Sequence, residues 1–135
     1  MIGVLEISAA VEILLKGKHA HEFRAVIRNY DAVLAPDLFS SELANTFWKY
    51  HQFRGLSVDK SLSCCELGLA LVDQFVDTRE VWREALHAAM SNNHPVYDLV
   101  YVICARRNSA TLVTMDRKLM TLAQHLGVSN FEVPD

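Results

Sequence analysis

The sequence predicts a three-layer α/β/α fold with a central, mainly parallel sheet. Short apolar runs rich in β-branched residues alternate along the chain with longer segments of helical periodicity. Strands separated by helices pair in parallel, in a sheet whose two faces are both covered. With 135 residues, 51% of them hydrophobic, the chain can bury one core but is too short for two ordinary domains. We therefore expect residues 1–135 to form a single domain.

The first half of the chain is predicted to run strand, helix, helix, strand, helix, helix. The second strand stops at Pro36, and this proline also opens the third helix, which ends at Gly55. Gly17 divides the first two helices. Serine side chains, which accept hydrogen bonds from free backbone N–H groups, are expected to cap the first and fourth helices. The strands cover residues 1–5 and 33–35, the helices residues 9–15, 19–30, 36–55 and 58–71, and the caps are Ser8 and Ser57.

The second half is predicted to run strand, helix, helix, strand, helix. Thr78 is the expected cap of its first helix. Pro95 suits a first helical position, and the helix that follows at residues 96–107 is apolar on almost every side, so it should be buried. Asp116 begins the last helix, and an apolar segment closed by Pro134 is predicted as an edge strand. The strands cover residues 75–76, 111–114 and 131–133, and the remaining helices residues 78–90 and 116–124.

Charge and composition restrict the classes of function. A net charge of −3 argues against a protein that coats nucleic acid electrostatically, but a metal-dependent nuclease gathers carboxylates in its pocket and remains compatible. No apolar run reaches the length of a membrane span, and no basic segment precedes one at the amino terminus. We expect a cytoplasmic protein without membrane contact. The cysteines lack C-x-x-C spacing and are expected to be buried thiols: Cys64, Cys65 and Cys104.

Four carboxylates are candidates for a metal site. Glu6 ends the first strand and Asp116 follows the last helix-flanked strand by two residues, so both should lie at the carboxyl edge of the sheet, where open α/β folds bind ligands. Asp98 lies inside an apolar helix, where a charge is costly unless it has a partner such as a cation. Glu42 has a similar apolar setting. Each acid also has an ordinary interpretation, as a helix cap, as a complement to a helix amino terminus or as an exposed loop residue.

Five segments match a known set of motifs in order and spacing along nearly the whole chain: VLEISAA at 4–10, APDL at 35–38, SELAN at 41–45, YDLVY at 97–101 and LVTMDRKL at 112–119. Together they resemble the four motifs of the PIN-domain family, and most closely its VapC branch of bacterial and archaeal toxins. The resemblance implies a PIN-like version of the three-layer fold and a ribonuclease activity.

By this resemblance, the protein would be an endoribonuclease that hydrolyses RNA phosphodiesters with Mg²⁺ or Mn²⁺. Both ions favour hard oxygen ligands, and such a cation can activate water and neutralise developing charge. Ser8 and Thr114 would act as hydroxyl helpers, and Asn45 would line the pocket. VapC-type toxins pair as homodimers and are held inactive by a cognate antitoxin, which implies both partners here. The implied acidic quartet is Glu6, Glu42, Asp98 and Asp116.

Two neighbouring positions depart from the family pattern, because Glu6 stands where the family has aspartate and Ile7 where it usually has a small residue. The extra methylene moves the carboxylate outward by roughly 1.5 Å, whereas a catalytic constellation must be held within about 0.5 Å. Two hypotheses therefore stay open. One is an active metal-dependent ribonuclease, and the other is a catalytically impaired PIN domain that binds RNA or a protein.

Other conspicuous residues receive structural or secondary roles. The histidines form no zinc motif. Aromatic residues of the helices and strands are expected to serve core or subunit packing rather than base stacking: Phe47, Trp48, Phe53, Phe75 and Trp82. Leucines of the central helices suggest either an interface or a larger core: Leu62, Leu67, Leu69 and Leu71. Four basic residues could contact phosphates near the pocket: Arg106, Arg107, Arg117 and Lys118. Arg106 and Arg107 suit a solvated helix end at least as well.

Overall fold

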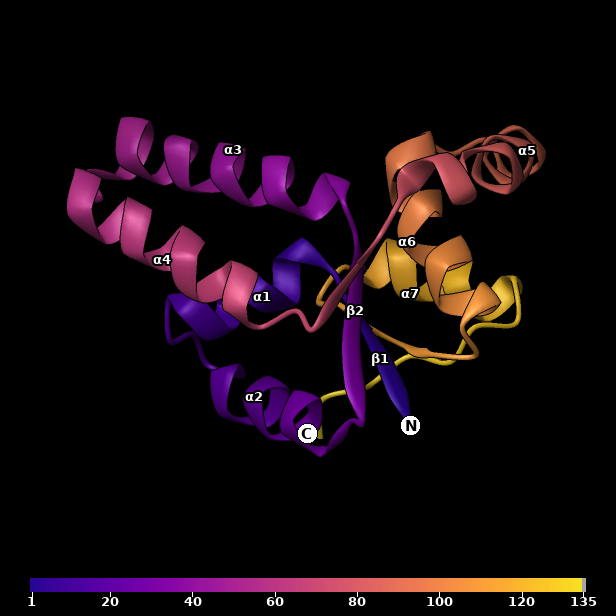
Figure 1. Cartoon of the computed structure of the whole chain (residues 1–135), viewed down its shortest axis with the longest axis horizontal. Helices are drawn as coiled ribbons and strands as arrows, with labels where there is room; N and C mark the ends of the chain where they lie inside the picture. The colour runs from indigo at the N-terminus through magenta and orange to yellow at the C-terminus, as the bar shows by residue number, and fades with distance from the viewer. Residues whose placement is uncertain (135) are drawn as a thin grey trace.

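The computed structural model describes residues 1–134, in which a four-stranded, all-parallel sheet lies between two groups of helices (Figure 1). The strands follow each other across the sheet in the order β3-β2-β1-β4, so β1 and β2 lie inside and β3 and β4 at the edges. The strands are β1 (Ile2–Leu5), β2 (Ala32–Pro36), β3 (Gln74–Val76) and β4 (Thr111–Val113).

Helices α1 to α4 lie on one side of the sheet and α5 to α7 on the other, as Figure 1 shows. This confirms the predicted three-layer α/β/α arrangement with a parallel sheet. The helices are α1 (Ile7–Leu14), α2 (Ala20–Asn29), α3 (Leu38–Arg54), α4 (Val58–Ala70), α5 (Trp82–Asn92), α6 (Val96–Arg107) and α7 (Arg117–His125), with a short 3-10 helix, η1 (Thr78–Glu80).

Helix α6 is the centre of the second helical layer. Every residue from 99 to 105 is buried, because α6 packs on β1, β2 and β4 with one face and on α5 with the other. The helix therefore has no solvent-facing side over these two turns, which confirms the burial predicted from its nearly continuous apolar sequence. The charged residues stay at its two ends, with Asp98 in the first turn and Arg106 and Arg107 in the last.

Two helix starts differ from the prediction. Ser8 lies inside α1, and the capping side chain is that of Glu6, which accepts a hydrogen bond from the backbone N–H of Ser8. Pro36 ends β2 instead of opening a helix, and α3 begins at Leu38. Pro36 can occupy the end of the strand because the next ladder bond uses the backbone N–H of Asp37, which donates to the Val76 carbonyl at 2.8 Å, and not an N–H of residue 36.

Two more helix starts differ from the prediction, both in the second half of the chain. Thr78 does not cap a helix that reaches residue 90. It begins η1, whose cap is Asp77, and α5 starts only at Trp82. Pro95 has an extended backbone and occupies the position before α6, which begins at Val96. The φ angle that the proline ring fixes suits both the first helical position and the position before it, so the predicted start of this helix was wrong by one residue.

Residues 131–133 form no strand. The chain makes one isolated bridge to the edge of the sheet, between Leu112 and Asn130. The backbone N–H of Phe131 donates to the Leu112 carbonyl at 2.9 Å, and the Phe131 ring then packs edge-on against Phe23 at 5.7 Å. Pairing stops there because β4 is only three residues long and because Pro134 has no N–H to donate.

Most of the aromatic residues expected in the core lie on the surface. Phe47 is buried, but the Trp48 side chain is 53% exposed and the Phe53 side chain 70% exposed, and Phe75 and Trp82 are also exposed. The structure therefore contradicts core packing for all but Phe47, while the alternative of packing between subunits stays a prediction. The larger-core reading also fails for Leu62, Leu67 and Leu69, which are exposed on α4. Helical spacing reveals a face but not whether another element covers it.

The three cysteines are free thiols, as expected, but Cys65 is only partly buried whereas Cys64 and Cys104 are fully buried. Among residues 1–134, no helix combines the length and the apolar character that spanning a membrane requires.

Candidate active site

Three of the four candidate acids follow the carboxyl end of a strand, and the fourth lies at the start of α6. Glu6 directly follows β1, Asp116 follows β4, Glu42 lies in the second turn of α3 after β2, and Asp98 lies in the first turn of α6. Their charges interact in a closed ring: Glu6 with Asp116, Asp116 with Asp98, Asp98 with Glu42, and Glu42 with Glu6. The parallel topology thus gathers acids that are up to 110 positions apart in the chain, which follows from the residue numbers 6 and 116.

The Glu6 carboxylate is held by its neighbours. Its Oε1 accepts from the Ser8 backbone N–H at 3.2 Å, from the Ser8 hydroxyl at 2.5 Å and from the Thr114 hydroxyl at 2.5 Å. Burial raises the pKa of Glu6, the hydrogen bonds from Ser8 and Thr114 partly offset this, and the charge of Asp116 adds to the rise. The Glu6 side chain, one methylene longer than aspartate, is thus fixed in one place. The ordinary interpretation of Glu6 as an exposed loop residue is therefore wrong.

Thr114 joins three of these residues. It is fully buried, and it is the one polar side chain in the buried set among residues 1–134. Besides donating to Glu6, its Oγ1 accepts the backbone N–H of Asp116 at 3.0 Å and lies 3.1 Å from the Ser8 hydroxyl oxygen. The Ser8 hydroxyl oxygen accepts the backbone N–H of Met115 at 2.8 Å. These contacts lock the start of α1 to the loop between β4 and α7.

Glu42 is held from the opposite layer. The hydroxyl of Tyr101 donates to Glu42 Oε1 at 2.7 Å, and Tyr101 is almost completely buried. Burial raises the pKa of Glu42, the hydrogen bond from Tyr101 opposes this, and the charges of Glu6 and Asp98 raise it further. Burial and the nearby Glu42 charge also raise the pKa of Tyr101 far above its ordinary value, so the phenol stays a proton donor.

The last two acids have simpler surroundings. Asp116 caps α7, because its Oδ1 accepts the backbone N–H groups of Lys118 at 3.0 Å and Leu119 at 3.2 Å. Asp98 Oδ2 lies 3.6 Å from His94 Nε2. Burial raises the pKa of Asp98, the attraction of His94 lowers it and the charge of Asp116 raises it. The ordinary cap interpretation thus holds for one oxygen of Asp116.

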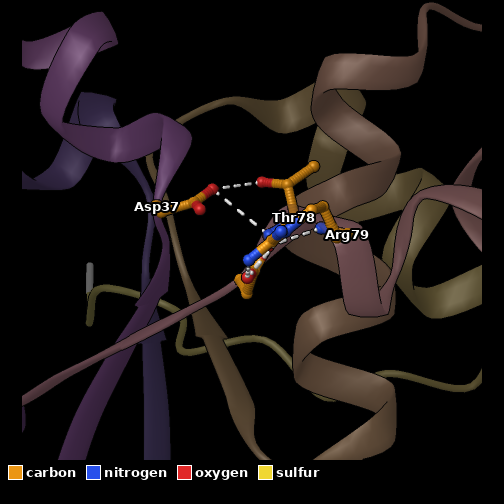
Figure 2. Close-up of polar contacts among 4 residues, drawn as sticks. Asp37, Thr78 and Arg79 are labelled. Atoms are coloured by element: carbon orange, nitrogen blue, oxygen red, sulfur yellow. Dashed lines mark hydrogen bonds and ion pairs between the residues drawn. The ribbon is translucent and has the colours of Figure 1, made fainter.

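The start of α3, which carries Glu42, is anchored to η1. Figure 2 shows Asp37 facing Thr78, and its Oδ1 accepts both the backbone N–H and the hydroxyl of that residue. Asp77 in turn accepts from the Arg79 guanidinium at 2.7 Å. Asp37 occupies the N-cap position of α3 but makes no cap there, because its carboxylate is used for this link to η1.

A groove of about 480 Å³ opens beside two of the acids. Its walls are α1 and α3, and Asn45 lines it together with Glu6, Ser8 and Glu42. Asp98 and Asp116 do not belong to its lining. The groove continues along α3 past Glu42 and is lined there by Thr46, Lys49 and Tyr50, and on the α1 side by Ile7, Val11 and Glu12.

Sequence reasoning missed some residues and misplaced others. Tyr101 stands within a matched motif, but nothing local marks its hydroxyl as the partner of Glu42. Lys49 could have been found from its spacing, since it lies one helical turn after Asn45. Arg106 and Arg107 lie at the far end of α6 from Asp98 and approach Glu84 at 3.5 and 3.8 Å, so they are surface residues away from the site. Arg117 and Lys118 are exposed beside Asp116.

The donor set fits a hard divalent cation in kind. All four acids supply carboxylate oxygens, and no hydrogen bond within residues 1–134 engages Glu6 Oε2, Glu42 Oε2 or Asp116 Oδ2. A cation would also offset both causes of the raised pKa values of Glu6, Glu42 and Asp98, which are burial first and the charges of the neighbouring acids second. In the same part of the chain, however, no three His, Cys, Asp or Glu side chains are already grouped closely enough to hold a metal ion.

Replacing Tyr101 by phenylalanine is expected to lower the free energy of unfolding by about 1–2 kcal/mol, because the half-buried Glu42 carboxylate loses its donor while the ring still fills the core. Urea denaturation near neutral pH measures this. Tyr97→Phe is the matched control, since Tyr97 lies on the same helix and is exposed. Equal stabilities of the two variants would show that the bond to Glu42 contributes nothing.

Comparisons with known proteins find similar folds at low sequence identity. The crystal structure of PAE2754 from Pyrobaculum aerophilum matches with a TM-score of 0.71 and 21% identity, over 96% of this chain and 92% of that one. The crystal structure of VapBC2 from Rickettsia felis, bound to a DNA fragment from their promoter, matches with a TM-score of 0.69 and 18% identity, over 98% of this chain and 100% of that one. The crystal structure of FitAcB from Neisseria gonorrhoeae matches with a TM-score of 0.66 and 16% identity, over 98% of this chain and 97% of that one.

A search against family models finds no match, and a search of curated proteins finds none either. The structural likenesses confirm the PIN-like fold that the sequence motifs predict.

Proposed function

We propose that this chain is a metal-dependent endoribonuclease of the VapC type, the toxin of a toxin–antitoxin pair. The observation that carries the proposal is the ring of four interacting carboxylates at the carboxyl edge of a parallel sheet. Such an edge is where open α/β folds bind ligands. Acids whose pKa values are raised by burial, and further by the charges of neighbouring acids, are more typical of a functional site than of a structural one.

The roles of the residues follow from their contacts. Ser8 and Thr114 fix one oxygen of Glu6 and leave the other for a ligand, and Tyr101 does the same for Glu42. Asp116 is oriented by the first turn of α7. A bound Mg²⁺ or Mn²⁺ would supply water activation and neutralise charge that develops on the phosphate. Asn45 lies in the groove wall beside the acids, where its amide can contact the RNA backbone.

The proposed partners rest on the sequence motifs and on one structural neighbour. VapBC2 is among the structural neighbours, and the sequence motifs point to the VapC branch independently. We therefore propose a cognate antitoxin as inhibitor and a homodimer as the functional unit. The free thiols and the absence of disulfides in residues 1–134 agree with the reducing cytoplasm as the site of action.

A second candidate function is a PIN domain that has lost catalysis and binds RNA or protein. Two observations favour it. Glu6 replaces the family's aspartate and has three donors on one oxygen, and no three ligands are grouped for a metal ion within residues 1–134. Metal binding separates the candidates, because a nuclease must bind the cation that it uses.

The decisive experiment is cleavage of a mixed pool of single-stranded and hairpin RNA by purified protein. We expect cutting with Mn²⁺ or Mg²⁺, no cutting with EDTA, and none with the Asp98→Asn variant, which controls for contaminating nucleases. Calorimetric titration of Mn²⁺ in parallel gives a readout independent of activity. Folded protein, free of any antitoxin, that neither binds Mn²⁺ nor cuts RNA would support the binding module instead.

The acids should also make stability depend on pH. Glu6, Glu42 and Asp98 have raised pKa values in the folded protein, so the fold favours their protonated forms. Their contribution to stability is present at low pH and is lost as the pH rises from the ordinary carboxyl range through the raised pKa values.

In EDTA, we therefore expect the melting temperature of the wild type to fall between about pH 5 and pH 7.5 relative to a Glu6→Gln, Glu42→Gln, Asp98→Asn triple variant. Scanning calorimetry at matched ionic strength measures the difference. Parallel curves for the two proteins would mean that the three carboxyls titrate normally in the fold.

A further inference from the structure

The groove beside the acids does not end at Lys49. A second hollow of about 210 Å³ is lined by Lys49, Tyr50, Phe53 and Arg54, and it shares Lys49 and Tyr50 with the groove. The α3 residues that line the two hollows recur every three or four positions and so follow one face of the helix from Glu42 to Arg54, which we call the track. Twelve residues of helix separate these ends, which corresponds to about 18 Å.

The charge changes sign along this track. At its inner end lie Glu6, Glu12 and Glu42, and at its outer end lie Lys49 and Arg54. No ion pair within residues 1–134 involves either of these two cations. Of these acids, Glu12 is already hydrogen-bonded, because its Oε2 accepts the His19 backbone N–H at 2.9 Å.

Glycine 17 makes that position of Glu12 possible, since a Cβ at Gly17 would lie 1.9 Å from Glu12 Oε1. The acid is thus held against the loop between α1 and α2 and does not neutralise the basic end. Lys49 and Arg54 remain available for an anionic ligand.

Aromatic rings accompany the two cations. Phe53 is 70% exposed, and Trp48 packs edge-on against it at 5.9 Å, which limits the motion of the ring. Tyr50 is half-buried and packs against Phe47 at 5.9 Å. Exposed rings held in place next to unpaired cations are the combination with which proteins bind single-stranded nucleic acid, because bases stack on the rings while cations contact phosphates.

We propose that the track from Lys49 to Arg54 binds a single-stranded flank of the RNA substrate, with Phe53 as a stacking platform and Lys49 and Arg54 as phosphate contacts. This inference rests on the proposed nuclease function for the direction of the track, since the strand would run from the basic end to the acids. Paired bases cannot reach a stacking ring, so the track selects single strands or loops over duplex.

Binding of a fluorescent single-stranded RNA, measured by anisotropy with EDTA present and with Asp98→Asn as the uncleaving background, tests the inference. We expect Lys49→Ala with Arg54→Ala to weaken binding at least about tenfold and to reduce the slope of log K against log salt by about 1.4. Phe53→Ala should weaken binding about tenfold and change the salt slope little.

The matched control is Arg28→Ala with Arg83→Ala, which removes the same charge from α2 and α5, outside both hollows. It should bind almost as well as the background protein. The duplex form of the same RNA should bind more weakly and be insensitive to Phe53→Ala. If the alanine variants unfold, Lys49→Gln with Arg54→Gln replaces them, and circular dichroism checks each fold.

The outcomes separate the two proposals. Wild-type cleavage together with unchanged RNA binding by the double variant and by Phe53→Ala would overturn this inference and leave the nuclease intact, with an acidic protein segment as the remaining ligand for the cations. Loss of RNA binding in the variants without any wild-type cleavage would support the track and reject the nuclease. No RNA binding by the background protein would overturn the track outright.

Discussion

Changing Asp98 or Asp116 to asparagine is expected to lower RNA cleavage by at least about a thousandfold, while the protein remains folded and as stable as the wild type or more so. Asparagine keeps the size of the side chain but removes the charge, so cation binding is lost. Removing either charge also relieves repulsion, because the Asp116 charge raises the pKa of both Glu6 and Asp98.

The two variants differ in an instructive way. Asparagine caps helices about as well as aspartate, so Asp116→Asn should keep the start of α7. Asp98→Asn leaves His94 without its charged neighbour at 3.6 Å. Initial cleavage rates with Mn²⁺ and thermal melting measure both effects, and Asp59→Asn, an exposed acid in the first turn of α4, is the matched control. Undiminished cleavage by either variant would remove that residue from the proposed site.

Thr114→Val should cause the largest loss of stability among the site variants, about 2–3 kcal/mol. Valine fills the same space in the core, but Glu6 loses a donor and the partly buried backbone N–H of Asp116 loses its acceptor. Cleavage should fall as well, since Glu6 is then positioned by Ser8 alone.

Thr114→Ser separates the hydroxyl from the rest of the side chain. Serine retains both hydrogen bonds and should recover most of the stability and of the cleavage rate. Urea denaturation and initial rates on the same preparations provide the comparison. A serine variant as defective as the valine variant would mean that the methyl group, and not the hydroxyl network, matters at this position.

Much of the architecture could be predicted from local patterns. Short β-branched runs, helical periodicity and glycine stops indicated the four strands and seven helices of the described residues in the correct order, with boundaries off by a few positions. The parallel sheet followed from that order, and it implied that Glu6 and Asp116 would meet at one edge. These features depend on interactions between near neighbours or on the rules of strand connection, both of which a sequence contains.

The errors arose where contacts between distant parts of the chain, or the lack of such contacts, decide the surroundings of a side chain. Thr78 has the chemistry of a helix cap, but its hydroxyl donates to Asp37, 41 positions away. Trp48 and Phe53 have core-like spacing, but no element of residues 1–134 covers their face of α3. Local preference is worth about 1 kcal/mol per cap, so one tertiary contact is enough to override it.

By itself, the sequence determined the order of the elements, the parallel sheet and the set of acids at its carboxyl edge. Only the tertiary structure decided how those acids are held. The Tyr101 hydroxyl meets Glu42 across 59 positions, and the Thr114 hydroxyl meets Glu6 across 108. It also decided that the groove beside Glu42 continues to Lys49 and Arg54. Contacts of this range leave no periodic trace in the chain, because they depend on how whole layers pack, and only the folded core brings their partners together.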